Sequence, residues 1–427
     1  MNIDMTKKAA YITLGCKLNY AETSTYERGF MNAGYESVPW TEVADLYIIN
    51  TCSVTEHADR KSRNIIRKLH RTSPSATIVV TGCYAQLKRT EVEAIDGVSL
   101  VFGADDKSSL VSGTLDFIDG RFKMTQDNAD ILRKSSELET FAAYSSGEER
   151  TRSFLKVQDG CDNFCAYCTV PFARGRSRSI SIETAVAEAK KIADAGVKEI
   201  VLTGVNTGDF GRKSGESFLD LLKALNDVKG IERYRISSIE PNLLTDDIVD
   251  WIASGTKFLP HFHIPLQSGS DTILKDVGRK YTTEFFASKI DYIRKRMGTN
   301  VFFGIDVIAG LPGETDELFM ETYNFLKDRI KPAFIHIFPY SKRPGTRSSV
   351  RKDQVQDCVK TKRVEMLEGL CKMLNEEFIE SQKGSREKVL FEETNNNGIM
   401  CGYTGNYIKV ERPWDPDLAG KIVEVTI

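Results

Sequence analysis

Short apolar runs alternate with amphipathic stretches through the first 112 residues. Apolar runs over residues 8–14, 45–50 and 76–81 predict strands, and the stretches over 20–33 and 55–71 predict helices between them. A strand–helix–strand order of this kind favours a parallel sheet with helices on its faces. The first part of the chain is therefore predicted to be an α/β domain.

The same rhythm repeats about six times between residues 153 and 340. A helix over residues 182–195 is the clearest of the intervening elements, with Ser181 as its N-cap and Gly196 at its end. Six units predict a partial (β/α)6 barrel rather than a complete eightfold one. The predicted strands cover residues 154–158, 199–203, 233–237, 261–265, 302–308 and 334–338.

The last part of the chain changes pattern twice. Residues 352–382 read as one helix rich in Lys, Glu and Leu. After Gly384, short alternating runs separated by turn residues predict strands at 389–392, 407–410 and 422–425, and together a small β-barrel. The predicted fold class is α/β, with a small β-barrel at the end of the chain. The predicted segments are an N-terminal domain at 8–118, a linker at 119–150, the partial barrel with its trailing helix at 151–382, and the β-barrel at 383–427.

Composition narrows the class of protein. A chain of 427 residues with 41% hydrophobic content can bury two or three cores. A formal net charge of -2 excludes a uniformly basic nucleic-acid coat but leaves room for local basic patches. With no run of about 18 apolar residues and no signal-peptide core at residues 1–5, we expect neither a membrane span nor export, and the cytoplasm is the expected compartment. Nine cysteines in that reducing compartment point to metal binding or catalysis.

Three cysteines stand close together just after the first predicted barrel strand. Cys161, Cys165 and Cys168 can ligate three irons of one 4Fe–4S cluster, which leaves the fourth iron open for a ligand. Barrels of this type place their chemistry at the ends of the strands. A zinc site usually adds a second C-x-x-C element or histidine, and none is near in sequence. Unligated structural thiols are the other alternative.

A second set of cysteines follows three successive strands of the first domain. Cys16, Cys52 and Cys83 each lie one or two residues beyond an apolar run. Because the carboxyl ends of parallel strands share one edge, we expect these side chains to converge on a second metal site. The alternative is three separate buried cysteines, since free cysteine is often buried. Cys358, Cys371 and Cys401 show no such pattern and are interpreted as structural thiols.

The spacing C-x-x-x-C-x-x-C at residues 161–168 resembles the signature of the radical S-adenosylmethionine (SAM) superfamily. Together with the second cysteine set, nearly the whole chain is similar to the methylthiotransferases, a family with an N-terminal cluster domain, a radical SAM partial barrel and a C-terminal TRAM β-barrel. Segments 14–19, 50–55, 81–86 and 338–343 most resemble the subgroup that acts on N6-threonylcarbamoyladenosine (t6A) in tRNA. The subgroups that act on isopentenyladenosine or on a ribosomal-protein aspartate resemble these segments less well.

The resemblance implies a radical enzyme with two 4Fe–4S clusters and SAM. A 5′-deoxyadenosyl radical would remove hydrogen from C2 of the adenine at position 37, and a methylthio group would be transferred to that carbon. The implied partners are the tRNA anticodon stem-loop and an electron donor such as flavodoxin or ferredoxin, with no DNA and no membrane. A non-enzymatic iron–sulfur carrier, or an RNA-binding module with a structural cluster, is the alternative class. The three-cysteine loop argues against a carrier, which normally uses four ligands.

The resemblance also implies residues that contact SAM, most of them at barrel strand ends. A glycine there lets backbone approach a ligand, and polar side chains there can reach its ribose and amino groups. Each position also has a competing role. Gly204 can be an ordinary loop glycine, Glu240 can be a solvated carboxylate, and Tyr167 can shield the cluster. Near Gln267, Ser270 can cap a helix. The predicted SAM contacts are Tyr167, Gly204, Ser238, Glu240, Gln267 and Asp306.

Two basic segments suit phosphate contacts. Arg174, Arg176 and Arg178 follow the cysteine loop at alternate positions, and arginine forms paired hydrogen bonds with phosphate. Lys342 and Arg343 form a further basic segment, and the helix at 55–71 is basic as well. Solvated faces are the competing interpretation. In the terminal barrel, the rings available either to stack on unpaired bases or to pack in a core are Tyr403, Tyr407 and Trp414.

Overall fold

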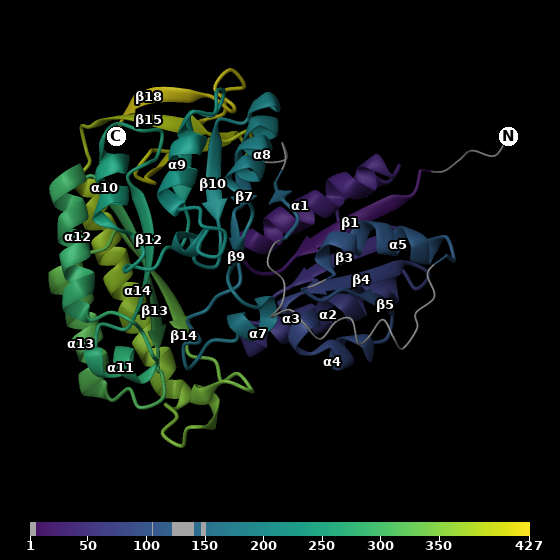
Figure 1. Ribbon diagram of the computed structural model, residues 1–427, viewed down its shortest axis with the longest axis horizontal. Helices are drawn as coiled ribbons and strands as arrows, with labels where there is room; N and C mark the ends of the chain where they lie inside the picture. The colour runs from purple at the N-terminus through teal and green to yellow at the C-terminus, as the bar shows by residue number, and fades with distance from the viewer. Residues whose placement is uncertain (1–5, 105, 122–140, 147–150) are drawn as a thin grey trace.

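The computed structural model describes residues 6–104, 106–121, 141–146 and 151–427. An N-terminal α/β domain lies beside a larger barrel, and a C-terminal sheet lies across one end of that barrel (Figure 1). The predictions for residues 1–5 and for most of the linker at 119–150 fall outside the described residues. In the part of the chain that is described, no helix is both long and apolar enough to cross a membrane.

The N-terminal domain contains a five-stranded parallel sheet in the order β2-β1-β3-β4-β5. Alternate residues of β3 point to opposite faces: Ile48 packs with α1 and α5, and Ile49 packs with α2. The three predicted strands and two helices are confirmed, while the short β2 and β5 were not predicted. The elements are β1 (Lys8–Thr13), α1 (Lys17–Asn32), β2 (Glu36–Val38), β3 (Leu46–Thr51), α2 (Glu56–Thr72), β4 (Thr77–Gly82), α3 (Cys83–Leu87), α4 (Arg89–Glu93), β5 (Val98–Val101) and α5 (Leu110–Ile118).

Six parallel strands then form the predicted partial barrel. Strands β7, β10 and β11 belong to one sheet, β12, β13 and β14 to another, and the parallel bridges Tyr234–Phe258 and Ser238–His263 join the two. A short strand, β6 (Tyr144–Ser145), pairs antiparallel with β7 at the open edge. The barrel strands are β7 (Arg152–Lys156), β10 (Glu199–Thr203), β11 (Arg233–Ile236), β12 (His261–Gln267), β13 (Phe302–Ala309) and β14 (Phe334–Pro339).

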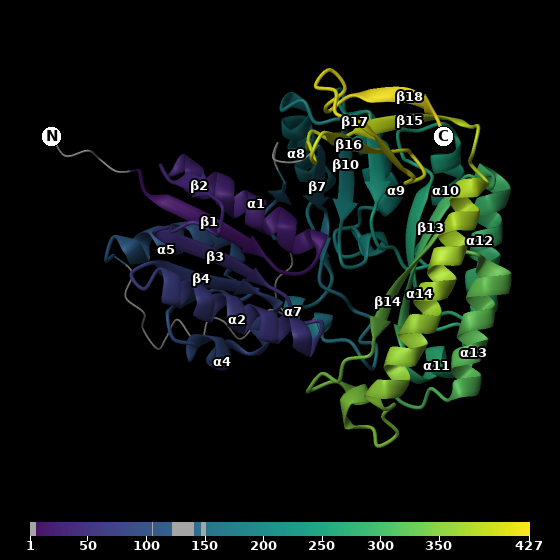
Figure 2. The ribbon, with the colours of Figure 1, turned by 180° about the vertical axis from the view of Figure 1, so that it is seen from behind.

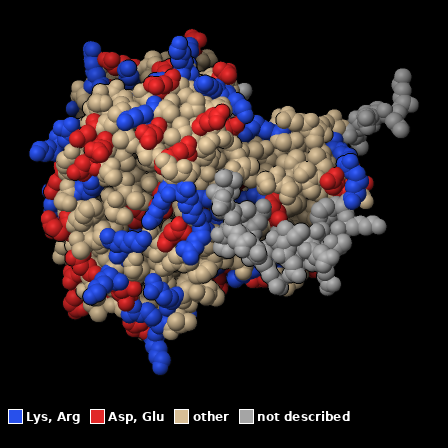
Figure 3. Space-filling model, in the orientation of Figure 1, with Lys and Arg blue, Asp and Glu red and all other residues tan. Residues whose placement is uncertain are grey.

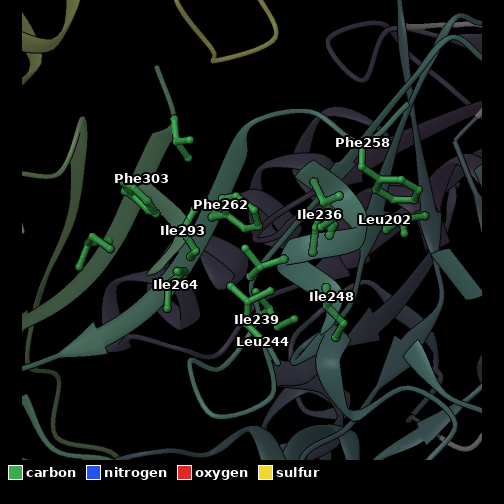
Figure 4. Close-up of a cluster of buried hydrophobic side chains, with 14 of the residues drawn as sticks. Leu202, Ile236, Ile239, Leu244, Ile248, Phe258, Phe262, Ile264, Ile293 and Phe303 are labelled. Carbon is green, nitrogen blue, oxygen red and sulfur yellow. The ribbon is translucent and has the colours of Figure 1, made fainter. Parts of the chain in front are cut away.

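Helices cover the outside of the barrel, and the long helix α14 (Asp357–Glu380) packs along β14 (Figure 2). Outward-facing residues such as Leu202, Ile236 and Phe303 form the main core with helix residues such as Ile248 (Figure 4). The residues between them on the same strands face the barrel interior, because successive side chains of a strand point to opposite faces. The other covering helices are α8 (Ile182–Asp194), α9 (Phe218–Asn226), α10 (Asp246–Ala253), α12 (Thr283–Met297) and α13 (Asp316–Asn324).

The C-terminal region is a four-stranded antiparallel sheet in the order β17-β16-β15-β18, where a small β-barrel was predicted. Its own core is small and includes Val389, Phe391 and Met400, with Trp414 packed against them. The strand β16 was not predicted, because its sequence contains a glycine and lacks clear alternation. The strands are β15 (Arg386–Phe391), β16 (Ile399–Tyr403), β17 (Lys409–Pro413) and β18 (Ile422–Thr426).

Two tyrosines of this region pack against the barrel. The rings of Tyr403 and Tyr407 stack with centroids 5.0 Å apart, and the guanidinium of Arg152 lies 4.7 Å over Tyr403. Tyr407 also contacts the ring of His261, at 5.0 Å. These contacts favour the packing role over base stacking, and they place the C-terminal sheet across the end of the barrel where its strands begin.

Candidate active site

The strands of the N-terminal sheet bring Cys16, Cys52 and Cys83 to one edge, as predicted. Burial, together with the neighbouring Cys83 and Cys16, raises the pKa of the Cys52 thiol to about 12. Gly82 precedes Cys83 with φ +98°, and a β-carbon there would lie 2.3 Å from the carbonyl oxygen of Thr51. Only glycine fits this turn, so the β4–α3 junction holds Cys83 close to the strand that carries Cys52.

The other cysteine set lies on the loop between β8 (Gln158–Asp159) and α7 (Val170–Arg174). Backbone N–H groups donate to Sγ of Cys161 and of Cys168, each at 3.4 Å, and Arg279 Nη1 donates to Sγ of Cys165 at 3.4 Å. Burial raises the pKa of the Cys161 and Cys168 thiols to about 12. A bound metal is therefore needed to hold these groups as thiolates at neutral pH.

The spacing of the sulfur atoms distinguishes a cluster from a single ion. Tetrahedral zinc with Zn–S bonds of about 2.3 Å requires sulfur atoms about 3.8 Å apart. Neither cysteine set brings three ligand atoms within 4.8 Å of one another; among the described residues, His263, Asp306 and His336 are the group that meets this limit. The wider spacing fits a multi-iron cluster better than zinc.

A cavity of about 290 Å³ lies at the carboxyl ends of the barrel strands, and we call it the cysteine cavity. Its walls include Cys161, Cys165 and Cys168 from the loop. Val54 and Thr55, which closely follow Cys52, line it from the N-terminal domain. The segment that follows Cys52 thus lies on the wall of the same cavity as the cysteine loop, although the two are distant in sequence.

Most of the predicted SAM contacts line this cavity: Tyr167, Ser238, Glu240, Gln267 and Asp306. Gly204 does not line it, whereas Val205 and Asn206, which follow it, do. A β-carbon on Gly204 would lie 2.9 Å from Gln158 Oε1. The glycine therefore lets this turn pack against Gln158 and directs the next two residues into the cavity.

Gln267 has an uncommon backbone conformation. Its φ is +71°, and the pairing of β12 with β13 shifts register between Pro265 and Gln267. Bulges of this kind turn a side chain away from its regular direction and often lie next to active sites. Here the irregularity places the Gln267 side chain on the cavity wall.

Two residues that the sequence analysis missed also line the cavity. Arg279 donates to Cys165 and forms an ion pair with Glu240, whose pKa is nevertheless raised by burial. Asn206 accepts a hydrogen bond from the backbone N–H of Glu240 at 3.2 Å, while its Nδ2 is buried without a partner among the described residues. The unpaired donor on the cavity wall suits a polar ligand. No local motif distinguishes either residue in the sequence.

The predicted phosphate contacts Arg174 and Arg178 are instead buried in an ion network between the domains. Arg174 contacts Glu22 at 3.1 Å and Asp159 at 3.0 Å, and Arg178 contacts Asp159 at 3.2 Å. Both guanidinium groups are only a few per cent exposed, so the prediction that they bind RNA is wrong for this structure. Alternating arginines after the loop were read as a surface because the sequence does not show their acidic partners.

The network contains more cations than carboxylates. Lys107 contacts Glu22 at 2.8 Å, and Lys156 contacts Glu22 at 2.8 Å and Asp159 at 2.7 Å. Four buried cations therefore face two buried carboxylates. Burial raises the pKa of Cys83, whereas the positive charges of Arg174 and Lys107 oppose that effect. The excess positive charge beside this thiol fits an anionic thiolate cluster at Cys16, Cys52 and Cys83.

Of the three other residues predicted to contact phosphate, one is buried between the domains and two are exposed. Arg343 is 4% exposed and donates to Ser53 Oγ and Asp59 Oδ2, both at 2.7 Å, so it too is a contact between domains. Arg176 and Lys342 remain exposed. The visible face of the molecule mixes basic and acidic side chains (Figure 3), as the near-neutral charge predicts.

Comparison with known proteins agrees with this geometry. Residues 155–326 match the radical SAM superfamily, and residues 8–103 match an uncharacterized protein family, UPF0004. The threonylcarbamoyladenosine tRNA methylthiotransferase MtaB of Bacillus subtilis is 42% identical over 98% of this chain and 93% of its own length. The chain belongs to the radical SAM methylthiotransferase family.

Other members of the family are similar over comparable lengths. The MtaB protein of Aquifex aeolicus is 38% identical over 98% of this chain and its full length. The tRNA-2-methylthio-N(6)-dimethylallyladenosine synthase of Finegoldia magna is 32% identical over 97% of this chain and 91% of its own. Among solved structures, the radical SAM methyltransferase TsrM of Kitasatospora setae aligns with a TM-score of 0.58, covering 81% of this chain and 77% of that one at 15% identity. This last similarity supports the fold alone.

The residues present fit the cofactors of this family. Two separate sets of three cysteines, each too widely spaced for one ion, suit two 4Fe–4S clusters with one open iron each. The unpaired Nδ2 of Asn206 and the polar wall at Ser238 and Gln267 suit the amino acid and ribose parts of SAM beside the loop cluster.

Proposed function

We propose that this protein is a tRNA-modifying enzyme that converts t6A at position 37 to 2-methylthio-t6A. The observation that carries the proposal is that the cysteine loop and the segment after Cys52 line one cavity. Such an arrangement brings the segment beside the second cysteine set next to the cysteine loop, which favours the proximity that a two-centre reaction requires. The family members named as acting on threonylcarbamoyladenosine are also the more similar relatives.

In this proposal, Cys161, Cys165 and Cys168 hold the cluster that binds SAM, and Cys16, Cys52 and Cys83 hold the second cluster. When bound, these groups supply a carbon-centred radical and the sulfur to be transferred, chemistry that no side chain provides. The chain itself positions them. Arg279 orients Glu240 and donates to Cys165, and the buried ion network fixes the N-terminal domain against the barrel.

The RNA surface in this proposal surrounds the mouth of the cysteine cavity. Helix α2 begins beside Thr55, on the cavity wall, and its exposed cations extend away from it. Arg176 and Lys342 add positive charge near the cysteine loop and the β14 end. The exposed cations of α2 are Arg60, Lys61, Arg67, Lys68 and Arg71. An external donor such as flavodoxin or ferredoxin would supply the electron.

The test uses protein loaded with iron and sulfide under anaerobic conditions. An anticodon stem-loop carrying t6A is incubated with SAM, sulfide and a flavodoxin reducing system, and its nucleosides are measured by mass spectrometry. Formation of 2-methylthio-t6A, lost in Cys165→Ala and retained in Cys358→Ala, is expected. Cys358 is an exposed cysteine of α14 and serves as the matched control. Product only from an isopentenyladenosine stem-loop would contradict the proposed substrate.

A further inference from the structure

A second cavity lies inside the barrel, and we call it the lumen cavity. It has a volume of about 550 Å³ and is lined by interior-facing residues near the amino ends of the strands, including Arg235, His263, Gly304 and His336. Tyr403 and Tyr407 of the C-terminal region line its far end. Lys17, the first residue of α1, enters it from the N-terminal domain.

The lumen cavity and the cysteine cavity lie on the same strands. Along β12, His261 and His263 line the lumen cavity, and Pro265 and Gln267 line the cysteine cavity. The two share a wall, because Asp306 of the cysteine cavity is bonded to His263 Nε2 at 2.5 Å. The lumen cavity is therefore the next space along the strands from the cysteine cavity, within one residue pair of a base bound beside the cysteine loop.

The charges of the lumen cavity favour an anion. Arg152 and Arg235 are both paired, to Glu392 at 2.7 Å and to Glu199 at 2.7 Å respectively. Lys17 has no ion pair or hydrogen bond from its ammonium group among the described residues, and its side chain remains accessible to solvent. Among the described residues the cavity thus offers one uncommitted cation, Lys17, with three paired cations on its walls, since Lys409 also lines it and pairs with Glu411 at 2.6 Å.

A metal ion is the competing occupant, since His263, Asp306 and His336 have ligand atoms within 4.8 Å of one another. Two histidines and a carboxylate are a common ligand set for divalent metals. However, Lys17, Arg152 and Arg235 line the same cavity and would repel a divalent cation. Asp306 is also already bonded to His263.

The backbone adds a second sign of a ligand. Gly304 lies in the middle of β13 on the lumen face, where a glycine weakens a strand and often marks close approach of a ligand. A β-carbon there would lie 3.4 Å from His336 Nε2 and from the Phe302 ring, so a small side chain would fit and a larger one would fill the space.

We propose that the lumen cavity holds the threonylcarbamoyl substituent of the substrate and that Lys17 binds its carboxylate. This inference rests on the proposed t6A function, and it makes Lys17 a specificity-determining residue of that reaction. The carboxylate is the only charged group of the substituent, so an unpaired ammonium on the cavity wall distinguishes t6A from adenosine or its uncharged derivatives. His336 lies on the wall of the same cavity, where it can meet a hydroxyl or amide group of the substituent.

The experiment compares three anticodon stem-loops on the loaded holoenzyme: one with t6A, one with its methyl ester, and one with unmodified adenosine. Fluorescence anisotropy gives the dissociation constants, and mass spectrometry gives kcat/KM. The native protein should bind the acid about tenfold more tightly than the ester, as expected for a hydrogen bond to a charged group. Lys17→Met should bring this ratio close to one, Lys17→Arg should restore part of it, and Lys190→Met on the exposed face of α8 should leave it unchanged.

Gly304→Val provides a variant away from the cysteines. It should weaken binding of the t6A stem-loop and leave binding of the unmodified stem-loop at the native value. Equal losses for acid and ester in Lys17→Met, or an unchanged ratio, would overturn the inference, as would a further bound metal that is lost in His336→Ala. If carboxylate-dependent binding is found but no methylthiolated product forms, the proposed reaction fails and the binding site stands. If product forms but the acid and the ester bind equally, the proposed reaction stands and the proposed binding site fails.

Discussion

Arg343, in the loop after β14, donates a hydrogen bond to Asp59 of α2, with 2.7 Å between Nη2 and Oδ2. Both side chains are buried, and Arg343 also bonds Ser53, the residue after Cys52. The barrel is therefore fastened to the N-terminal domain beside the second cysteine set. Since the pair lies between domains, it affects both stability and the placement of Cys52.

Arg343→Ala should destabilise the protein. We expect a loss of about 3 kcal/mol, the low end for breaking a buried ion pair, because Lys88 remains 3.2 Å from Asp59. Thermal unfolding of the cluster-free protein measures the effect. Lys342→Ala, at the exposed neighbouring position, should change stability by no more than about 0.5 kcal/mol. Equal melting temperatures for Arg343→Ala and the native protein would show that the pair does not stabilise the interface.

Acid should weaken the contact between the domains through Glu22 and Asp159. Burial acts to raise the pKa of Glu22, but Lys107, Lys156 and Arg174 hold it well below its ordinary value of 4.5. The pKa of Asp159 is also held low, against the effect of burial, by Lys156, Arg174 and Arg178. Because the unfolded carboxylates bind protons at a higher pH than the folded ones, this stabilisation is complete above about pH 4.5 and declines as pH falls further.

Melting temperatures of cluster-free protein between pH 7 and pH 3 test this expectation. The native protein should lose stability steeply below about pH 4.5. Glu22→Gln should be less stable at pH 7, because one carboxylate then faces four cations, and it should depend less on pH in the acid range. A Glu22→Gln profile parallel to the native one would exclude Glu22 as a source of acid sensitivity.

The two cysteine sets should be separable by mutation. Cys165→Ala should lose about half of the bound iron and all formation of 5′-deoxyadenosine, since one of three ligands of the SAM site is removed. Cys52→Ala should also lose about half of the iron but still form 5′-deoxyadenosine, while 2-methylthio-t6A disappears. Iron analysis and chromatography of the products measure both. If Cys52→Ala abolished 5′-deoxyadenosine as well, the two sites would not be independent.

Exposed and buried arginines near the cysteine loop should respond differently to substitution. Arg176→Ala should weaken stem-loop binding several-fold and reduce the slope of log K against log salt by about 0.7 to 0.9, as for one lost phosphate contact. Arg178→Ala should instead lower the melting temperature, because it leaves Asp159 with fewer cations. Binding titrations at several salt concentrations measure the first effect. An unchanged slope for Arg176→Ala would remove it from the RNA surface.

Local pattern was sufficient for much of this structure. Strand and helix periods predicted the six barrel strands and the main N-terminal elements, because each buries an apolar face on its own. The position of Cys16, Cys52 and Cys83 just after strands predicted their convergence, since parallel strands end at one edge. The spacing of Cys161, Cys165 and Cys168 marked the other site without any tertiary information.

The residues that were misjudged depend on distant partners. Arg174 and Arg343 look like surface cations until Glu22 and Asp59 are placed beside them, more than a hundred residues away in sequence. Arg279 has no motif and reaches the site only because the turn between α11 (Asp271–Asp276) and α12 brings it within 3.4 Å of Cys165 Sγ. Strand β16 forms mainly because β15 and β17 lie beside it, so its own sequence predicts it weakly.

The shared ion network has a consequence for how this architecture is inherited. Glu22 and Lys107 come from the N-terminal domain, and Lys156, Asp159, Arg174 and Arg178 come from the start of the barrel. Without Glu22, three cations of the barrel would be left with a single acid, so the barrel has no electrically balanced form of its own. Recombination that exchanges one domain between distant relatives would succeed only where both parents carry matching charges, which ties the evolution of the two domains together.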